Sequence, residues 1–196
     1  MKVEAAIAAL DAGGIVAVPT DTVYGLAAEV SQPSAVATLF KLKDRPTLVP
    51  IPVLVDSVEQ IEFLGVEWPD EAQGLADAFW PGALTIIVKV PHELSVMLGG
   101  DDDTAGFRIP DDDMLRRMMA VLGPFAVTSA NAHGETPCHN AYEVLQRFSK
   151  RDELRGAIDG GERSGDVSSV VDLSVTPWRM LREGAVSTAE LTRVLG

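Results

Sequence analysis

The alternation of helix-like and strand-like segments predicts an α/β fold, with a twisted sheet of mixed parallel and antiparallel strands flanked by helices. Apolar residues at helical spacing recur along the chain, for example in residues 3–10 and 70–79. Between such segments lie short apolar runs of strand length, such as residues 15–18 and 83–90. No repeat, linker or low-complexity segment divides the sequence, so we expect residues 1–196 to form a single domain.

The predicted helices share apolar side chains three or four residues apart. They cover residues 3–10, 34–42, a segment that begins near residue 57, and residues 70–79, 111–122, 141–148 and 188–195. The predicted strands are short apolar runs bounded by turn residues. They cover residues 15–18, 51–55, 83–90, 105–109, 125–128, 170–173 and 179–182, and residues 157–161 are predicted to form a strand and turn.

The composition is that of an ordinary globular protein, with 46% hydrophobic and 23% charged residues. The formal net charge of −13 argues against general nucleic-acid binding, because such binding needs cations to displace counterions from the phosphates. A single cysteine excludes an internal disulfide and favours a cytoplasmic location. We expect neither a membrane span nor a signal peptide, because no apolar run has the required length or position.

Metal ligands are poorly represented in the sequence. The three histidines show no ligand spacing, so a structural zinc site is not expected. Two acidic clusters, Asp101–Asp103 and Asp111–Asp113, could be interpreted as metal sites. We interpret them instead as solvated acids of a loop and of a helix N-terminus, because aspartate favours both positions.

A polar turn follows the first predicted strand. Residues 15–18 lead into Pro19, and Thr20, Asp21 and Thr22 come directly after it. Open α/β sheets bind ligands beyond the carboxyl ends of their strands, so small hydroxyl side chains at this point indicate a binding site. A buried strand that leads into a polar turn is also ordinary architecture, and this alternative stays open.

Three cations crowd the end of the following helix. Lys41, Lys43 and Arg45 are close together in the sequence, and Pro46 stops the helix. In a chain with a net charge of −13, this cluster indicates an anion-binding pocket. The alternative is that these residues are surface cations that complement the helix macrodipole.

Arg108 stands between Phe107 and Ile109 in a short predicted strand. An arginine buried there without a partner is costly, so it either faces solvent or holds an anion. Strand alternation places its side chain on the face opposite both neighbours. We expect Arg108 to be partly exposed in a concave pocket, within reach of Thr20 or Ser168, and without an Asp or Glu that saturates its guanidinium.

Several motifs occur in the order in which one protein family carries them. Pro-Thr-Asp-Thr-Val-Tyr-Gly-Leu at residues 19–26 is followed by Lys-x-Arg-Pro at residues 43–46. The later motifs are Trp-Pro-Gly-Ala-Leu-Thr (80–85), Phe-Arg-Ile-Pro (107–110), Ser-Ala-Asn (129–131), Pro-Cys (137–138), Asp-Gly-Gly (159–161), Ser-Ser (168–169) and Leu-Arg-Glu-Gly (181–184). Each short motif is weak alone, but their ordered occurrence resembles the Sua5/YrdC/YciO family, the threonylcarbamoyl-AMP synthases.

This resemblance implies a YrdC-like fold and a reaction. Such proteins join threonine, bicarbonate and ATP to form threonylcarbamoyl-AMP and pyrophosphate, and the product feeds the threonylcarbamoyl modification of transfer RNA. The resemblance further implies that Mg²⁺ arrives with the ATP phosphates and that the partners include the machinery that transfers the product to tRNA. The chain length is similar to that of the single-domain YrdC type, so we do not expect the additional C-terminal domain of the Sua5 type.

The resemblance also implies roles for individual residues. Arg108 would bind the carboxylate of threonine, and Thr20 and Ser168 would complete the amino-acid site. Lys43 and Arg45 would face the triphosphate as the catalytic cations. All reactants are anionic, so fixed cations and aligned donors suit this chemistry better than a strong protein base.

The remaining implied contacts concern ATP. The residues that would hold or border the nucleotide are Thr104, Ser129, Asn131, Cys138 and Arg182. Two positions depart from the pattern of the longer family members, which often carry Asn and His where this chain has Val49 and Leu54. Both positions would contact a substrate in those members. The two departures therefore weaken the prediction that threonine is the substrate more than the prediction that a nucleotide binds.

Two alternative functions follow from the same residues. One is a paralogous carbamoyl or nucleotidyl transferase with another acceptor. The other is a double-stranded-RNA-binding or ribosome-associated module, in which RNA would occupy a basic cleft formed by Lys41, Lys43, Arg45, Arg108 and Arg182. The net charge disfavours RNA binding. Binding that falls steeply with salt and saturates with duplex RNA would favour the RNA-binding module over the enzyme.

Overall fold

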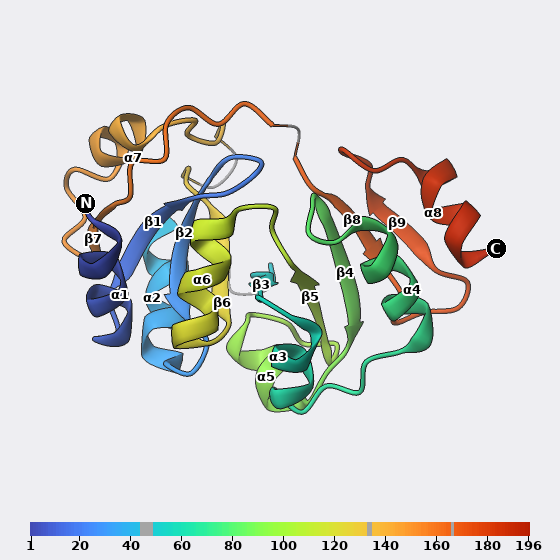
Figure 1. Ribbon diagram of the computed structural model, residues 1–196. Coiled ribbons are helices and arrows are strands. Elements are labelled where there is room, and N and C mark those ends of the chain that lie inside the picture. Colours follow the sequence, from blue (N-terminus) through green and yellow to red (C-terminus); the bar gives the residue numbers. More distant parts are fainter. Residues whose placement is uncertain (44–48, 133–134, 166) are drawn as a thin grey trace.

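The computed structural model describes residues 1–43, 49–132, 135–165 and 167–196, and shows helices packed around one central sheet (Figure 1). Within these residues, none of the helices is long and apolar enough to cross a membrane. The α/β architecture with a mixed sheet confirms the predicted fold class.

The described strands form a nine-stranded sheet in the order β7-β1-β2-β6-β3-β5-β4-β8-β9. The pairs β1–β7, β3–β5 and β4–β8 are parallel, and the other neighbours are antiparallel. The strand bounds are β1 Ile15–Pro19, β2 Tyr24–Glu29, β3 Val53–Leu54, β4 Leu84–Lys89, β5 Thr104–Arg108, β6 Phe125–Ser129, β7 Leu154–Ala157, β8 Ser169–Asp172 and β9 Arg179–Arg182.

The helices lie on both faces of the sheet (Figure 1). Their bounds are α1 Val3–Asp11, α2 Pro33–Lys43, α3 Val58–Phe63, α4 Asp70–Phe79, α5 His92–Met97, α6 Asp113–Leu122, α7 Ala141–Arg147 and α8 Thr188–Leu195. Side-chain caps fix the start of three of them. The Asp112, Asn140 and Ser187 side chains accept hydrogen bonds from the first-turn N–H groups of α6, α7 and α8.

Each face of the sheet carries its own apolar core. The larger core includes Phe107 of β5 and Ile86 of β4, and it is covered by α2, α3, α4, α5, α7 and α8. The smaller core includes Val16, Val18 and Leu54, and it is covered by α1 and α6. In the part of the chain that the structure describes, the smaller core does not extend over β4, β8 and β9. The sheet face there is left open for a site.

Most predicted elements are confirmed. The predicted bounds of α4, β9 and α8 match those observed, and most others differ by one or two residues at an end. The predicted strand 51–55 shortens to Val53–Leu54, and the strand predicted at 157–161 lies instead at Leu154–Ala157.

Two elements, β2 and α5, were not predicted. The sequence of β2 is rich in alanine and glycine, which have low strand propensity, yet all six of its residues are buried between β1 and β6. Gly25 permits this packing, because a Cβ atom there would lie 2.5 Å from a methyl carbon of Val127. Burial in the sheet interior therefore overrides the local preference.

We expect substitution of Phe107 by alanine to lower the free energy of unfolding by about 3–5 kcal/mol, because this ring fills the larger core. Phe107 is fully buried, and its ring meets Trp68 edge-on at a centroid distance of 6.3 Å. Urea-induced unfolding followed by circular dichroism measures the change. Phe63→Ala is the matched control, since Phe63 is 90% exposed, and its effect should stay within about 0.5 kcal/mol. Equal losses in both variants would contradict this assignment of the core.

Candidate active site

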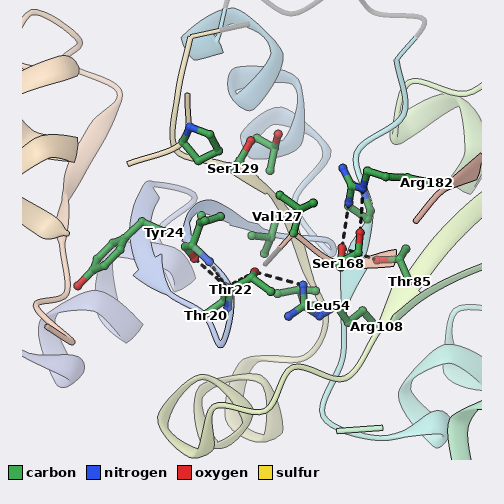
Figure 2. Close-up of a pocket in the computed structure, with 16 residues that line it drawn as sticks. Thr20, Thr22, Tyr24, Leu54, Thr85, Arg108, Val127, Ser129, Ser168 and Arg182 are labelled. Atoms are coloured by element: carbon green, nitrogen blue, oxygen red, sulfur yellow. Dashed lines mark hydrogen bonds between the residues drawn. The ribbon is translucent and has the colours of Figure 1, made fainter. Parts of the chain in front are cut away.

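A pocket of about 240 Å³ opens on the sheet face beside the smaller core (Figure 2). Strand alternation directs Leu54, Thr85, Arg108 and Val127 to this face, while Phe107 and Ile109 belong to the larger core on the other face. The turn after β1 and the segment before β8 complete the wall. The lining includes five of the predicted site residues, Thr20, Arg108, Ser129, Ser168 and Arg182.

The turn between β1 and β2 is held by its own hydroxyl groups. The Oγ1 atom of Thr20 donates to the carbonyl of Val23 at 2.7 Å and accepts from the N–H of Thr22 at 3.1 Å. The backbone of Gly165 rests on this turn, where its N–H donates to the Thr22 carbonyl and a Cβ atom would lie 2.6 Å from the Asp21 carbonyl oxygen. The turn therefore presents its side chains in a fixed geometry.

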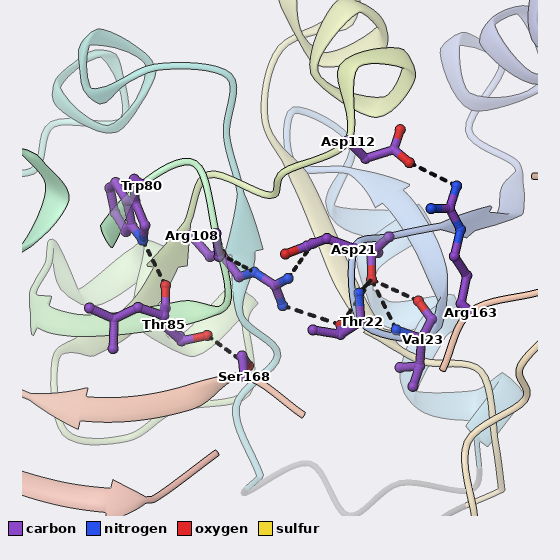
Figure 3. A network of polar contacts seen from close by, with 12 residues as sticks. Asp21, Thr22, Val23, Trp80, Thr85, Arg108, Asp112, Arg163 and Ser168 are labelled. Carbon is purple, nitrogen blue, oxygen red and sulfur yellow. Dashed lines mark hydrogen bonds and ion pairs between the residues drawn. The ribbon is translucent and has the colours of Figure 1, made fainter. Parts of the chain in front are cut away.

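Arg108 is anchored by three acceptors (Figure 3). Its Nε donates to the carbonyl of Gly82 at 2.9 Å, its Nη1 lies 3.5 Å from the Thr22 Oγ1, and its Nη2 forms an ion pair with Asp21. The pocket position near Thr20 and Ser168 agrees with the prediction. The predicted partial exposure is wrong, because the residue is 6% exposed. Asp21 pairs with Arg108 through one carboxylate oxygen, so the guanidinium has an acidic partner that does not saturate it.

The burial of Arg108 beside Asp21 has a physical reason. Burial of a guanidinium without a counterion is costly, and Asp21 offsets that cost from the adjacent turn. Burial is also the main cause that lowers the pKa of Arg108, and nearby Arg182 lowers that pKa further while Asp21 raises it. The pairing uses one carboxylate oxygen, so Arg108 retains N–H groups for a further acceptor.

Arg182 places a second guanidinium in the pocket. Its Nε donates to the carbonyl of Ser168 at 2.8 Å and its Nη2 to the Ser168 hydroxyl at 3.0 Å. Burial lowers the pKa of Arg182. No carboxylate of the described residues forms an ion pair with Arg182, so the Arg108, Asp21 and Arg182 side chains together carry a net positive charge. The pocket is electrostatically suited to an anion.

Lys43 lies beneath this pocket, not on the surface. It is 2% exposed, and its Nζ donates to the Thr128 hydroxyl at 3.0 Å, the Ser129 carbonyl at 2.8 Å and the Asn131 Oδ1 at 3.0 Å. The interpretation of Lys43 as a surface cation of a helix end is therefore wrong. The end of α2 carries this ammonium into the sheet, where it ties together the polar residues that follow β6.

Three other predicted ATP residues lie in different surroundings. Asn131 is 6% exposed and donates from Nδ2 to the Glu135 carbonyl, beside Lys43 and Ser129. Cys138 lies in the larger core with its side chain 1% exposed, and burial raises the pKa of its thiol. Thr104 begins β5 at the end away from Arg108 and donates to the Asp102 carboxylate at 2.7 Å. The structure does not bring Thr104 into the pocket.

Arg45, the remaining predicted site residue, lies outside the described residues. Among the residues that are described, no group of three or more His, Cys, Asp or Glu side chains is placed to hold a metal ion. Leu54 lines the pocket directly opposite Arg108 in the sheet register, so this departure from the pattern of the longer family members does fall at the site.

Sequence reasoning missed three contributors to the pocket. The Asp21 side chain was noted in the polar turn but not as the partner of Arg108, and no role was predicted for the Gly82 carbonyl or for Thr85. Thr85 Oγ1 lies 3.3 Å from the Ser168 Oγ, on the strand next to Arg108. The Pro-Thr-Asp-Thr and Trp-Pro-Gly-Ala-Leu-Thr motifs contain all three residues and were the available signal.

The fold and the pocket define an α/β protein with a desolvated, cationic, hydroxyl-lined site. A family model described as "Telomere recombination", which covers Sua5, YciO and YrdC proteins, matches residues 8–184. The chain belongs to the Sua5/YciO/YrdC family.

Individual relatives match most of the chain. A protein of Mycobacterium tuberculosis is 38% identical over 192 residues, which cover 97% of this chain and 88% of the relative. The threonylcarbamoyl-AMP synthase of Pyrococcus abyssi is 36% identical over 197 residues, which cover 100% of this chain and 57% of that protein. The crystal structure of P. abyssi Sua5 complexed with L-threonine superposes with a TM-score of 0.89 at 36% identity, covering 99% of this chain and 57% of that chain. The present chain thus spans little more than half of these P. abyssi proteins.

The hydrogen bonds of Lys43 predict that its substitution lowers the stability of the fold. We expect Lys43→Met to lower the free energy of unfolding by roughly 1–3 kcal/mol, because the Thr128 hydroxyl, the Ser129 carbonyl and the Asn131 Oδ1 each lose a hydrogen bond from the ammonium group. Thermal or urea unfolding measures this loss. Lys41→Met is the control, because Lys41 is exposed on the same helix and should change stability by less than about 0.5 kcal/mol. An unchanged stability of Lys43→Met would contradict the structural role.

Proposed function

We propose that this chain is a threonylcarbamoyl-AMP synthase, which joins L-threonine, bicarbonate and ATP and releases pyrophosphate. One observation carries this proposal: the Arg108 and Arg182 side chains line the same pocket, together with several hydroxyl groups. The support from relatives is the 36% identity to a P. abyssi synthase and the threonine complex of P. abyssi Sua5.

The proposed reaction has two steps. The neutral threonine amine and bicarbonate condense to a carbamate: a C–N bond forms, a C–O bond of bicarbonate breaks, and the departing hydroxide takes up the amine proton and leaves as water. A carbamate oxygen then attacks the α-phosphorus of ATP, an O–P bond forms, the bond to the β-phosphate oxygen breaks, and pyrophosphate leaves. Both steps bring anions together, so positioning and fixed positive charge are the main contributions required of the protein.

Arg108 suits the threonine carboxylate in this scheme. The Gly82 carbonyl and Asp21 fix the orientation of the guanidinium before substrate arrives, so little side-chain freedom is lost on binding. The planar fork of arginine matches a carboxylate and donates two parallel hydrogen bonds to it. The Thr20 hydroxyl and the Ser168 hydroxyl border the same pocket and are proposed to contact the amino acid.

The nucleotide is proposed to bind between Ser129 and Arg182, which line opposite parts of the same pocket. In this arrangement Lys43, which lies below the pocket, holds Ser129 and Asn131 in place and adds positive charge near the nucleotide. Arg45 is proposed to contact the triphosphate. Mg²⁺ is proposed to arrive with the ATP phosphates, which are its usual ligands in such sites.

In the proposed reaction, the release of pyrophosphate should depend on both threonine and bicarbonate. Incubated with ATP, Mg²⁺, bicarbonate and L-threonine, the protein should release pyrophosphate and form the threonylcarbamoyl adenylate. A coupled pyrophosphate assay, with mass spectrometry of the adenylate, measures both products. Omission of either threonine or bicarbonate should reduce release to background. Pyrophosphate release that is independent of threonine, or that depends on another amine, would favour a paralogous transferase and overturn the assignment.

The geometry of Arg108 predicts a selective defect. Arg108→Lys keeps the charge beside Asp21 but loses the fork, so the kcat/KM for threonine should fall about ten- to a hundredfold, whereas the apparent affinity for ATP should stay within about twofold. Steady-state kinetics with each substrate varied in turn separate the two effects. Arg117→Lys, an exposed residue of α6, is the control and should behave as the unmodified chain does. An equal loss for both substrates would contradict the carboxylate role.

A further inference from the structure

Two hollows flank α3, one on each side, and neither shares a lining residue with the active-site pocket. On one side, a hollow of about 740 Å³ lies between α3, α5 and the C-terminal end of α6. On the other side, a hollow of about 610 Å³ lies between α3 and α4. The two hollows share Glu59, and α3 and α5 form the lower edge of the molecule in Figure 1. We call this continuous region the α3 surface.

The first hollow has an apolar floor. Leu64, Leu94, Met97 and Leu122 contribute to it from three different segments. Phe63 stands at its edge with 90% of its side chain exposed. Large apolar side chains that gather around a hollow mark interaction sites more often than isolated ones do.

The apolar residues continue onto the neighbouring helices. Val96 of α5 is 53% exposed and Val121 of α6 is 69% exposed, and each is adjacent in sequence to a residue of the apolar floor. Phe63, Val96 and Val121 thus place exposed apolar area on all three helices that border the hollow. The fold itself gains nothing from this exposure.

The rim of the α3 surface is acidic. Its carboxylates are Asp56, Glu59, Glu62, Asp77 and Glu93. Of the described residues that line either hollow, Arg116 alone is a lysine or arginine, and it is paired with Asp113. A hydrogen bond from Ser57 lowers the pKa of Glu59, so that carboxyl group remains ionised at neutral pH.

We propose that the α3 surface binds an amphipathic helix of a partner protein, with an apolar stripe flanked by lysine or arginine. The apolar floor accepts side chains at helical spacing, as in other complexes in which a helix lies in a groove. The acidic rim on both sides of α3 complements basic flanks and repels acidic ones. The proposal concerns a surface apart from the active site and does not depend on the proposed reaction.

Two other occupants fit the same surface poorly. A symmetric contact between two copies would place the same carboxylates opposite one another, because an isologous interface uses one patch on both subunits. Nucleic acid would meet Glu59, Glu62 and Glu93 with its phosphates. A basic amphipathic partner satisfies both the apolar and the charged features.

The surface lies close to the support of Arg108. Trp80 and Pro81 line the second hollow, and the carbonyl oxygen of the next residue, Gly82, accepts a hydrogen bond from the Arg108 guanidinium. An occupant of the α3 surface would thus lie on the outer side of the loop that holds Arg108. This proximity gives the surface a direct structural connection to the pocket.

The test uses the full chain and two fluorescent peptides of identical composition. The first is a 16-residue Leu/Lys peptide with leucine at helical spacing, and the second has the same residues in an order without a helical apolar stripe. Fluorescence anisotropy at about 0.15 M salt, where charge attraction over distances beyond roughly 8 Å is screened, compares their affinities. We expect the patterned peptide to bind at least tenfold more tightly than the other.

Variants locate the binding. Phe63→Ser should weaken binding of the patterned peptide about tenfold, because it removes a large apolar contact. Glu59→Gln and Glu93→Gln should each weaken it several-fold and flatten its dependence on salt. The matched controls are Tyr142→Ser, which removes a 71% exposed aromatic residue on α7, and Glu4→Gln, which removes an exposed acid on α1. Both controls should leave binding unchanged.

Three outcomes would overturn the proposal. Equal binding of the two peptides, or equal losses in the control variants, would show a non-specific attraction to an acidic chain. Sedimentation velocity that reveals a dimer abolished by Phe63→Ser would show that a second copy covers the surface. Urea-induced unfolding serves as the check of folding, because Phe63 is exposed and Phe63→Ser should leave the unfolding midpoint nearly unchanged while it weakens the peptide complex.

Discussion

The ion pair between Arg108 and Asp21 is the interaction on which the site depends. A guanidinium that is 6% exposed is costly to desolvate, and Asp21 together with the Gly82 carbonyl offsets that cost. The same contacts fix the plane of the guanidinium. They come from two segments distant in sequence, the turn after β1 and the loop before β4, so the pocket forms only when the sheet is assembled. Within the described residues, Arg182 adds positive charge without a carboxylate of its own.

The two faces of the sheet explain why the pocket lies where it does. Helices cover the larger core across the sheet, whereas among the described residues α1 and α6 cover the opposite face near β1, β2, β3 and β6. The open part of that face receives Thr85 and Arg108 from the strands and Ser168 from the segment before β8. Along β5, core packing and binding fall on opposite faces: Phe107 packs in the larger core, and its neighbour in sequence, Arg108, lines the pocket.

Local patterns predicted much of this structure, and tertiary contacts account for the errors. Helix α4 and strand β9 follow from apolar spacing and turn residues, and alternation alone assigned Arg108 to its face. Strand β2 could not be predicted because its alanines and glycine are strand residues only through burial. The burial of Lys43 depends on the oxygens of Thr128, Ser129 and Asn131, more than eighty residues away, and no local pattern encodes that contact.

The most direct test of this account is a crystal structure of the chain with bound L-threonine and an ATP analogue that cannot be cleaved. We expect the threonine carboxylate to accept two hydrogen bonds from the Arg108 guanidinium while Asp21 remains paired with it. We also expect Thr20 and Ser168 to border the amino acid, and Ser129 and Arg182 to border the nucleotide. Threonine bound elsewhere, or an Arg108 that contacts only Asp21 and protein carbonyls in the complex, would contradict this account.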